Sequence, residues 1–252
     1  MTLWEAIAIF AAGIGAGGIN AVVGSGSLIT FPTMVAVGLP PIVANVSNNI
    51  GLVPGSLTGA LGYRTELTGQ RERLIRLGVA SIVGSLIGGV LLLFLPASTF
   101  NVVVPILIGL ACVLVVAQPR LNRWLSTRRE DPHPHGGPWL WIGVLAAGMY
   151  GGYFGAAQGV LLIGLLGSFL DDDLQRVNAA KNVLSLLVNA TAALLFILVA
   201  EVDWRAVALV ALGATIGGFL GARVGRKLPA PVLRGFVVCV GVIAIVKLVA
   251  AP

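Results

Sequence analysis

Apolar residues run through this chain in long stretches separated by short polar segments. Their lengths match the about 20 residues that a helix needs to cross a bilayer, so the pattern predicts an all-α polytopic membrane protein. The stretches cover residues 3–38, 42–62, 74–94, 100–118, 139–170, 177–200, 204–224 and 231–250.

The first and fifth stretches are too long for one crossing, and each has a glycine-rich interruption in its middle. These interruptions lie at 23–27 and 155–159. Each stretch is expected to divide into a helix and a second piece of about a dozen residues, which would span about 18 Å of a hydrocarbon layer about 30 Å thick. Two crossings and a re-entrant hairpin remain open for each. Unpaired backbone at that depth is tolerated only inside protein or beside a watery cavity.

The two halves of the chain resemble each other when one is shifted by 133 residues. Gly26 then falls on Gly159, Asn45 on Asn178 and Asn49 on Asn182. We interpret this as a duplication of about five segments in each half, one broken or re-entrant helix pair included. The expected domains are a first transmembrane repeat at 1–118, a cytoplasmic linker at 119–138 and a second repeat at 139–252.

Charge decides the expected orientation. An odd number of segments inverts the second half, and this places the basic loops at 63–73, 119–138, 171–176 and 225–230 on one side. Of the sixteen basic residues, only Arg205 and Lys247 then lie on the other side. The positive-inside rule predicts that the basic side is cytoplasmic and that both termini lie outside.

Composition supports the membrane assignment. Hydrophobic residues make up 57% of the 252 residues and charged residues 10%, and the mean hydropathy is +0.98. The net charge of +6 lies in loops between apolar runs, so we expect a lipid bilayer and no nucleic acid as partner. Nothing at the N-terminus resembles a cleaved signal, and Cys112 and Cys239 suggest neither a disulfide nor a metal site.

Several motifs carry a resemblance to a known family. The segments "GSGSLITFPTMVAVGLPPIVANVSNNIG", "YGGYFGAAQGVLLI" and "DLQRVNAAKNVLSLLVNATAALLF", with "VDW" and "GGFLGARVGRKLP", are similar to the two repeats of the TauE/SafE membrane permeases, also called sulfite exporters. The resemblance implies export of a small sulfur-containing anion such as sulfite, sulfoacetate or a related organosulfonate. The sequence departs from the glycine-richest family pattern at Ser25, Ser27, Ala157 and Gln158.

The interruptions are the expected substrate site. A half-helix that starts near the membrane midplane offers free N–H groups and a positive dipole end, which suit an anion. Tight helix crossing is the competing role for the glycines, and we favour it for isolated ones such as Gly84 and Gly217. The candidate substrate-binding residues are Gly24, Ser25, Gly26, Ser27, Asn45, Asn49, Gln158, Gly159, Asn178, Lys181 and Asn182.

Lys181 has two alternative roles. It could contact the anion inside the membrane, or it could snorkel to the polar segment at 171–176, about one turn away. Hydrogen bonds between helices are the competing role for the asparagines. We favour the site for Asn49 and Asn182, and we expect the structural role for Asn20, Asn189 and Thr58.

No arrangement typical of an enzyme is present. All ten acidic residues lie at segment ends or in loops, so no carboxylate is placed for a midplane proton relay. His133 and His135 stand alone in a proline-rich linker, and we expect no metal, no cofactor and no enzymatic activity. The hypothesis is potential-assisted export of an anion. An importer or channel for another small anion or metabolite and a non-transporting scaffold are the alternatives, and homo-oligomerisation stays open.

Overall fold

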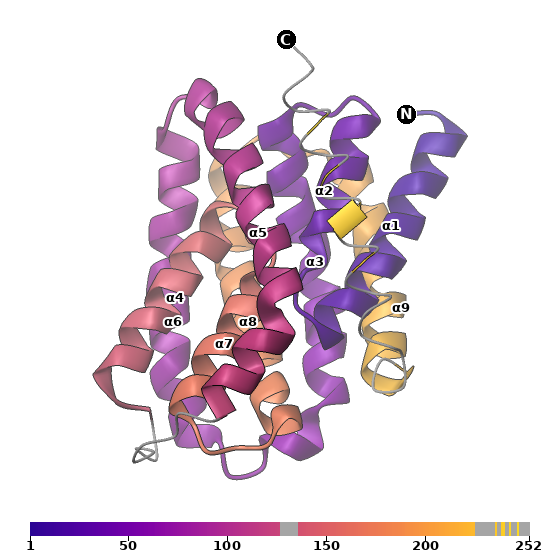
Figure 1. The fold of residues 1–252 in the computed structure, drawn as a ribbon. Helices are drawn as coiled ribbons and strands as arrows, with labels where there is room; N and C mark the ends of the chain where they lie inside the picture. Colours follow the sequence, from indigo (N-terminus) through magenta and orange to yellow (C-terminus); the bar gives the residue numbers. More distant parts are fainter. Residues whose placement is uncertain (127–135, 225–234, 236–237, 240–241, 243–245, 247–252) are drawn as a thin grey trace.

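The computed structural model describes residues 1–126 and 136–224, together with 235, 238, 239, 242 and 246. The described part is helical and contains no strand (Figure 1). Its helices are α1 (Leu3–Val22), α2 (Ser27–Ala36), α3 (Pro41–Gly62), the 3-10 helix η1 (Arg64–Leu67), α4 (Arg71–Phe94), α5 (Ala97–Ser126), α6 (Gly137–Tyr153), α7 (Gln158–Phe169), α8 (Leu174–Val199) and α9 (Trp204–Val224).

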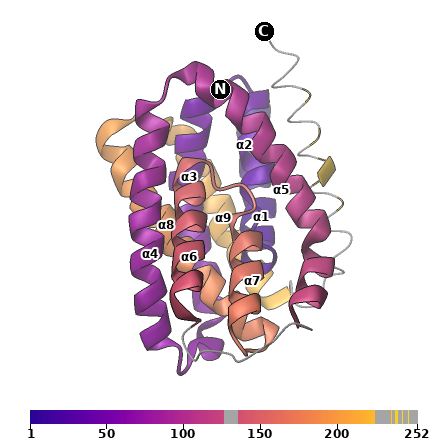
Figure 2. The same ribbon diagram turned by 60° about the vertical axis from the view of Figure 1, so that its left-hand side comes forward.

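Both interrupted stretches form antiparallel hairpins. A Cβ on Gly26 at the start of α2 would lie 2.4 Å from the carbonyl of Ala16 in α1, and Ile29 reaches Gly15 one turn further on. In the second half, Gly151 faces Gln158 and Gly143 faces Leu165 in the same antiparallel sense. Figure 2 shows α6 and α7 side by side, joined by a short connection. The short pieces α2 and α7 therefore turn back toward the end from which their partners start.

The halves are interleaved through close helix crossings. Helix α1 packs along α9, α4 packs along α6, and α3 and α8 lie against each other in the centre. Small residues allow these contacts: a Cβ on Gly84 would lie 2.2 Å from the carbonyl of Leu145, and one on Gly217 would lie 2.0 Å from that of Ile14. The prediction that Gly84 and Gly217 serve helix crossing is confirmed.

The loop at 63–73 and the turn at 171–176 lie at one end of the bundle and bind each other. Asp172 accepts hydrogen bonds from Arg73 and Arg176, and the Gln70 Nε2 donates to the Arg176 carbonyl at 3.1 Å. Burial alone would raise the pKa of Asp172, but the hydrogen bonds from the two arginines outweigh it and the pKa lies below its usual value. The prediction that the loop at 63–73 and the turn at 171–176 lie on the same side is confirmed.

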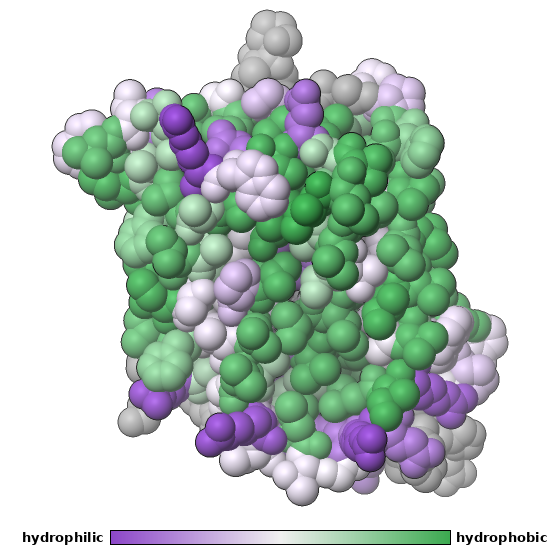
Figure 3. Space-filling view, turned by 180° about the vertical axis from the view of Figure 1, so that it is seen from behind, coloured by the Kyte–Doolittle hydropathy of each residue, from purple (hydrophilic) through white to green (hydrophobic). Residues whose placement is uncertain are grey.

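Five of the described helices are long and apolar enough to cross a membrane: α1, α4, α8, α9 and the Ser98–Ala117 part of α5. Figure 3 shows an apolar band across one face, with hydrophilic residues gathered at its two ends. The described chain is thus a polytopic α-helical membrane protein. Helix α5 continues to Ser126, past the predicted end of its apolar stretch at 118.

Several predicted features lie outside the described residues. These are most of the stretch at 231–250, the C-terminus, Lys247, the basic turn at 225–230, and the linker residues 127–135 with His133 and His135.

Candidate functional site

The first break follows the end of α1. The Val23 and Gly24 N–H groups both donate to the Ile19 carbonyl, which ends the helix, and Gly24 has φ +84°. This left-handed conformation favours glycine because any side chain would crowd the backbone. Ser25 follows, buried at 1% exposure, with a hydroxyl that has no hydrogen-bond partner. The chain resumes at Ser27 as α2.

The second break has a similar form at the end of α6. Gly155 has φ +76° and Ala157, the residue before α7, has φ 59°. Gln158 opens α7 and is buried, and its side-chain Nε2 has no hydrogen-bond partner. A buried amide without a partner costs about 1–3 kcal/mol, so this group is poised to donate to a ligand.

The two breaks touch each other in the interior. The Gly159 N–H donates to the Gly24 carbonyl at 3.0 Å. A Cβ on either glycine would lie 2.4 Å from the Cα of the other. Two segments 135 residues apart are therefore joined through main chain alone.

Helix α8 delivers three nitrogen donors to this place. Lys181 Nζ donates to the Asn20 carbonyl at 2.8 Å and to the Ala21 carbonyl at 3.3 Å. The Nδ2 atoms of Asn178 and Asn182 each donate to the same Ala21 carbonyl at 3.2 Å. These spacings follow from positions three and four apart on one helical face.

Lys181 does not snorkel to the polar end, so that alternative is wrong. Its side chain is 0% exposed, and its Cδ lies 2.9 Å from where a Cβ on Gly159 would be. The ammonium group sits at the C-terminal end of α1, where the helix dipole is negative and the last carbonyls lack partners within the helix. That interaction offsets part of the cost of burying the charge.

This donor cluster, formed by Asn178, Lys181 and Asn182, has more N–H groups than its two acceptors, the Asn20 and Ala21 carbonyls, can satisfy. A carbonyl oxygen has two lone pairs, yet three donors converge on that of Ala21. Lys181 is the one charged side chain among the buried residues that the structure describes. The surplus of N–H groups and the positive charge make the place suited to a small anion.

Helix α3 holds the second break as α8 holds the first. Asn45 Nδ2 donates to the Tyr153 carbonyl at the end of α6, at 3.0 Å. Asn49, one turn later, is buried and its Oδ1 has no donor. Asn45 and Asn178, which match in the shifted sequence, thus each hold the last turn of the first helix of the other half.

The structure brings some predicted site residues together and leaves others apart. Gly24, Gly159 and the donor cluster meet directly. Ser25 and Gln158 adjoin these glycines in sequence. Gly26 instead packs α2 onto α1, and Asn45 contacts the second break through the Tyr153 carbonyl. Ser27 and Asn49 are buried.

The residues expected to join helices do so. Asn20 and Asn189 both donate to the Ser56 hydroxyl, at 3.4 and 3.1 Å, and Thr58 donates to the Gly55 and Thr215 carbonyls. These predictions are confirmed.

Two features of the site were missed by sequence reasoning. The first is the Ala21 carbonyl. It is a main-chain group, so the residue type at position 21 gives no sign that it accepts hydrogen bonds from α8. An aromatic cluster also covers the second break: Phe31 of α2 contacts Phe154 edge to face with ring centroids 5.1 Å apart, and Phe100 of α5 lies 6.4 Å from both. Phe31 follows the first interruption closely and Phe154 immediately precedes the second, which was the available signal.

Comparisons with known proteins agree on one family. The family model described as "Sulfite exporter TauE/SafE" matches residues 9–248. The probable membrane transporter protein YfcA of Escherichia coli K12 is 28% identical over 214 residues, which cover 84% of this chain and 76% of that protein. A probable membrane transporter protein of Haemophilus influenzae is 24% identical over 96% of this chain and 93% of its own length.

A third relative, the probable membrane transporter protein ORF9 of a Sinorhizobium species, is 23% identical over 97% of this chain and 92% of its own length. No solved structure matches the chain. Because the family match extends over nearly all of it, the chain belongs to the sulfite exporter TauE/SafE family and is a membrane transporter.

Proposed function

We propose that this transporter exports a small sulfur-containing anion, such as sulfoacetate, sulfite or a related organosulfonate, across the cytoplasmic membrane. The anion binds where the two breaks meet. The observation that carries the proposal is the convergence of Lys181, Asn178 and Asn182 on a single carbonyl oxygen. An anion entering beside Ala21 would accept hydrogen bonds from the surplus N–H groups. These bonds are stronger to a charged oxygen than to the neutral oxygen of a carbonyl.

The other candidate residues would complete the site by their unpaired polar atoms. Gln158 Nε2 is a free donor, and the Ser25 hydroxyl can rotate to donate. A sulfonate or sulfite has three oxygens that can accept hydrogen bonds, whereas the Ala21 carbonyl has one. The absence of carboxylates from the buried residues described favours an anion over a cation.

An inverted repeat would explain the shared architecture of the halves. Helix α1 packs on α9 and α6 packs on α4, so the first helix of each half pairs with a late helix of the other. Asn45 and Asn178 then play equivalent parts at the two breaks. In the proposed mechanism the halves rock about the central contact and expose the site to each side in turn.

The expected orientation makes export favourable. With the basic end in the cytoplasm, the N-terminus lies outside and the anion leaves an inside-negative cell. The potential then contributes about 2.3 kcal/mol per charge per 100 mV. An importer or channel for another small anion is the second candidate, since the same donors would bind such an anion without fixing the direction of transport.

The first test is anion binding by the purified protein in detergent. Thermal shift is measured with sulfoacetate, sulfite, taurine and the carboxylate analogues, for the wild type, Lys181→Met, Gln158→Ala and the exposed control Arg205→Gln. We expect sulfoacetate to stabilise the wild type and Arg205→Gln, and the apparent Kd to rise at least about tenfold in Lys181→Met because a charge-assisted hydrogen bond is lost. An equal response from all four proteins would remove the site.

The second test is flux from proteoliposomes under an imposed potential. Loaded sulfoacetate should leave faster when the basic end faces a negative interior than when the potential is reversed. Flux that does not change on reversal would contradict potential-assisted export, whatever the binding test gives.

A further inference from the structure

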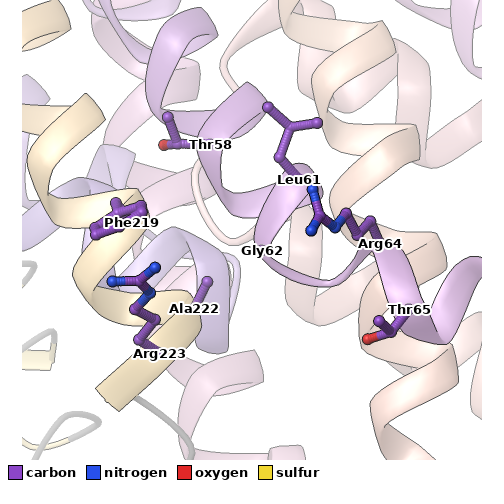
Figure 4. Close-up of a pocket in the computed structure, with 8 residues that line it drawn as sticks. All are labelled: Thr58, Leu61, Gly62, Arg64, Thr65, Phe219, Ala222 and Arg223. Atoms are coloured by element: carbon purple, nitrogen blue, oxygen red, sulfur yellow. The ribbon is translucent and has the colours of Figure 1, made fainter.

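A separate cavity lies at the basic end of the bundle, between the last turns of α3 and α9 (Figure 4). Its volume is about 350 Å³. It is lined by Thr58, Leu61, Gly62, Arg64, Thr65, Phe219, Ala222 and Arg223. None of these residues belongs to the central site, so the cavity needs its own explanation.

Two arginines bring positive charge to this cavity from different elements. Arg64 opens η1, and Arg223 belongs to the last turn of α9, where its guanidinium lies 4.0 Å from the centre of the Phe219 ring. Stacking on the ring fixes the plane of the guanidinium and leaves its N–H edge free. Among the described residues, neither arginine has a carboxylate within ion-pair distance or donates to a carbonyl.

The hydroxyl groups in the cavity are already engaged. Thr58 donates to main-chain carbonyls, and Thr65 donates to the Glu66 carboxylate at 2.6 Å. The two guanidinium groups are therefore the free donors, and a planar guanidinium binds the oxygens of a phosphate in bidentate fashion.

The walls of the cavity are apolar and face outward. Leu61 is 56% exposed and Phe219 is 48% exposed, and the neighbouring Leu57, Ile216 and Leu220 are exposed as well. In a membrane-spanning bundle such surface lies against acyl chains. The cavity thus combines positive donors at the level of the headgroups with an apolar wall directly beside them.

We propose that this cavity binds the phosphate headgroup of an anionic phospholipid, whose acyl chains lie along the exposed apolar residues of α3 and α9. A free anion would use only the two arginines, whereas a phospholipid also covers Leu61 and Phe219. Basic pockets between transmembrane helices on the side of the positive loops are suited to such headgroups. The lipid would join the ends of α3 and α9, one helix from each half.

The test measures lipid binding to the purified full chain in neutral detergent by native mass spectrometry and thermal shift. The probes are phosphatidylglycerol, phosphatidylcholine and soluble glycerol phosphate. The variant R64Q/R223Q removes both donors, and R120Q/R205Q removes the same charge at exposed positions away from the cavity. Folding of each variant is checked by gel filtration and circular dichroism.

We expect phosphatidylglycerol to bind the wild type and R120Q/R205Q, with phosphatidylcholine much weaker. In R64Q/R223Q the Kd should rise about 25-fold, since each basic residue near the surface contributes about fivefold. An unchanged Kd in R64Q/R223Q would overturn the proposal. Glycerol phosphate that binds as tightly as the lipid would also overturn it, because the cavity would then be a site for free anions.

Discussion

Gly159→Ala tests the contact between the two breaks. The added Cβ would lie 2.4 Å from the Gly24 Cα, 3.0 Å from the Gly24 carbonyl oxygen and 2.9 Å from the Lys181 Cδ. The first two are main-chain atoms, so the lysine alone cannot relieve the clash and the hairpins must separate. Overpacking costs about 1–3 kcal/mol, and loss of the Gly159 N–H bond adds about 1 kcal/mol.

We therefore expect the free energy of unfolding to fall by about 2–4 kcal/mol. The assay is unfolding by increasing SDS in mixed micelles, followed by circular dichroism, with anion binding measured in parallel. Binding should weaken because the donor cluster moves away from the second break.

Gly167→Ala is the matched control in the same helix. A Cβ at Gly167 has no atom within 4 Å, so this change should raise stability by up to about 1 kcal/mol through helix propensity. If Gly159→Ala were as stable as Gly167→Ala and bound anion equally well, the close main-chain contact between the breaks would be refuted.

Two further substitutions test one contact at the basic end of the bundle and one in its interior. Asp172→Asn removes the negative charge, and one of the two carboxylate oxygens, that Arg73 and Arg176 share, and should cost about 1 kcal/mol at pH 7. Because the Asp172 pKa is lowered in the fold, this cost should disappear as pH falls through that pKa. Ser56→Ala removes the acceptor of the buried Asn189 amide and should cost about 1–3 kcal/mol, measured by SDS unfolding.

Each of these changes has a control. Glu201→Gln removes an exposed carboxylate at the other end of the bundle and should leave the free energy of unfolding at pH 7 unchanged. Ser168→Ala removes a hydroxyl that bonds only within its own helix, to the Gly164 carbonyl. A loss from Ser168→Ala equal to that from Ser56→Ala would show that burial of Asn189 is not the cause.

The helices themselves could be predicted from the apolar pattern, because a long apolar stretch in a bilayer must pair its backbone N–H and C=O groups within the segment, as a helix does. The breaks at 23–27 and 155–159 were also predictable, since glycine clusters interrupt otherwise continuous runs. The choice between a second crossing and a hairpin was not, because it depends on what α2 and α7 pack against. The structure shows that α2 and α7 are 10 and 12 residues long, shorter than the about 20 residues that a full crossing needs.

The interior chemistry was only partly predictable. Pairing of the asparagines in the two halves pointed to α3 and α8, and the structure places Asn178 and Lys181 beside the first break. What Lys181 bonds to could not be read from the sequence, because its acceptors are the carbonyls of Asn20 and Ala21. Every residue has such a carbonyl, and only tertiary packing selects which ones meet a donor.

The contact between the two breaks, at Gly24 and Gly159, consists of main-chain groups. Contact between the halves and recognition of an anion therefore depend on different residues. At the proposed site, closing the pathway would need only small residues at Gly24 and Gly159, whereas recognition of the anion would fall to neighbours such as Ser25 and Gln158. We expect related permeases to change their preferred cargo by substitution at those neighbours, with the closing geometry left as it is.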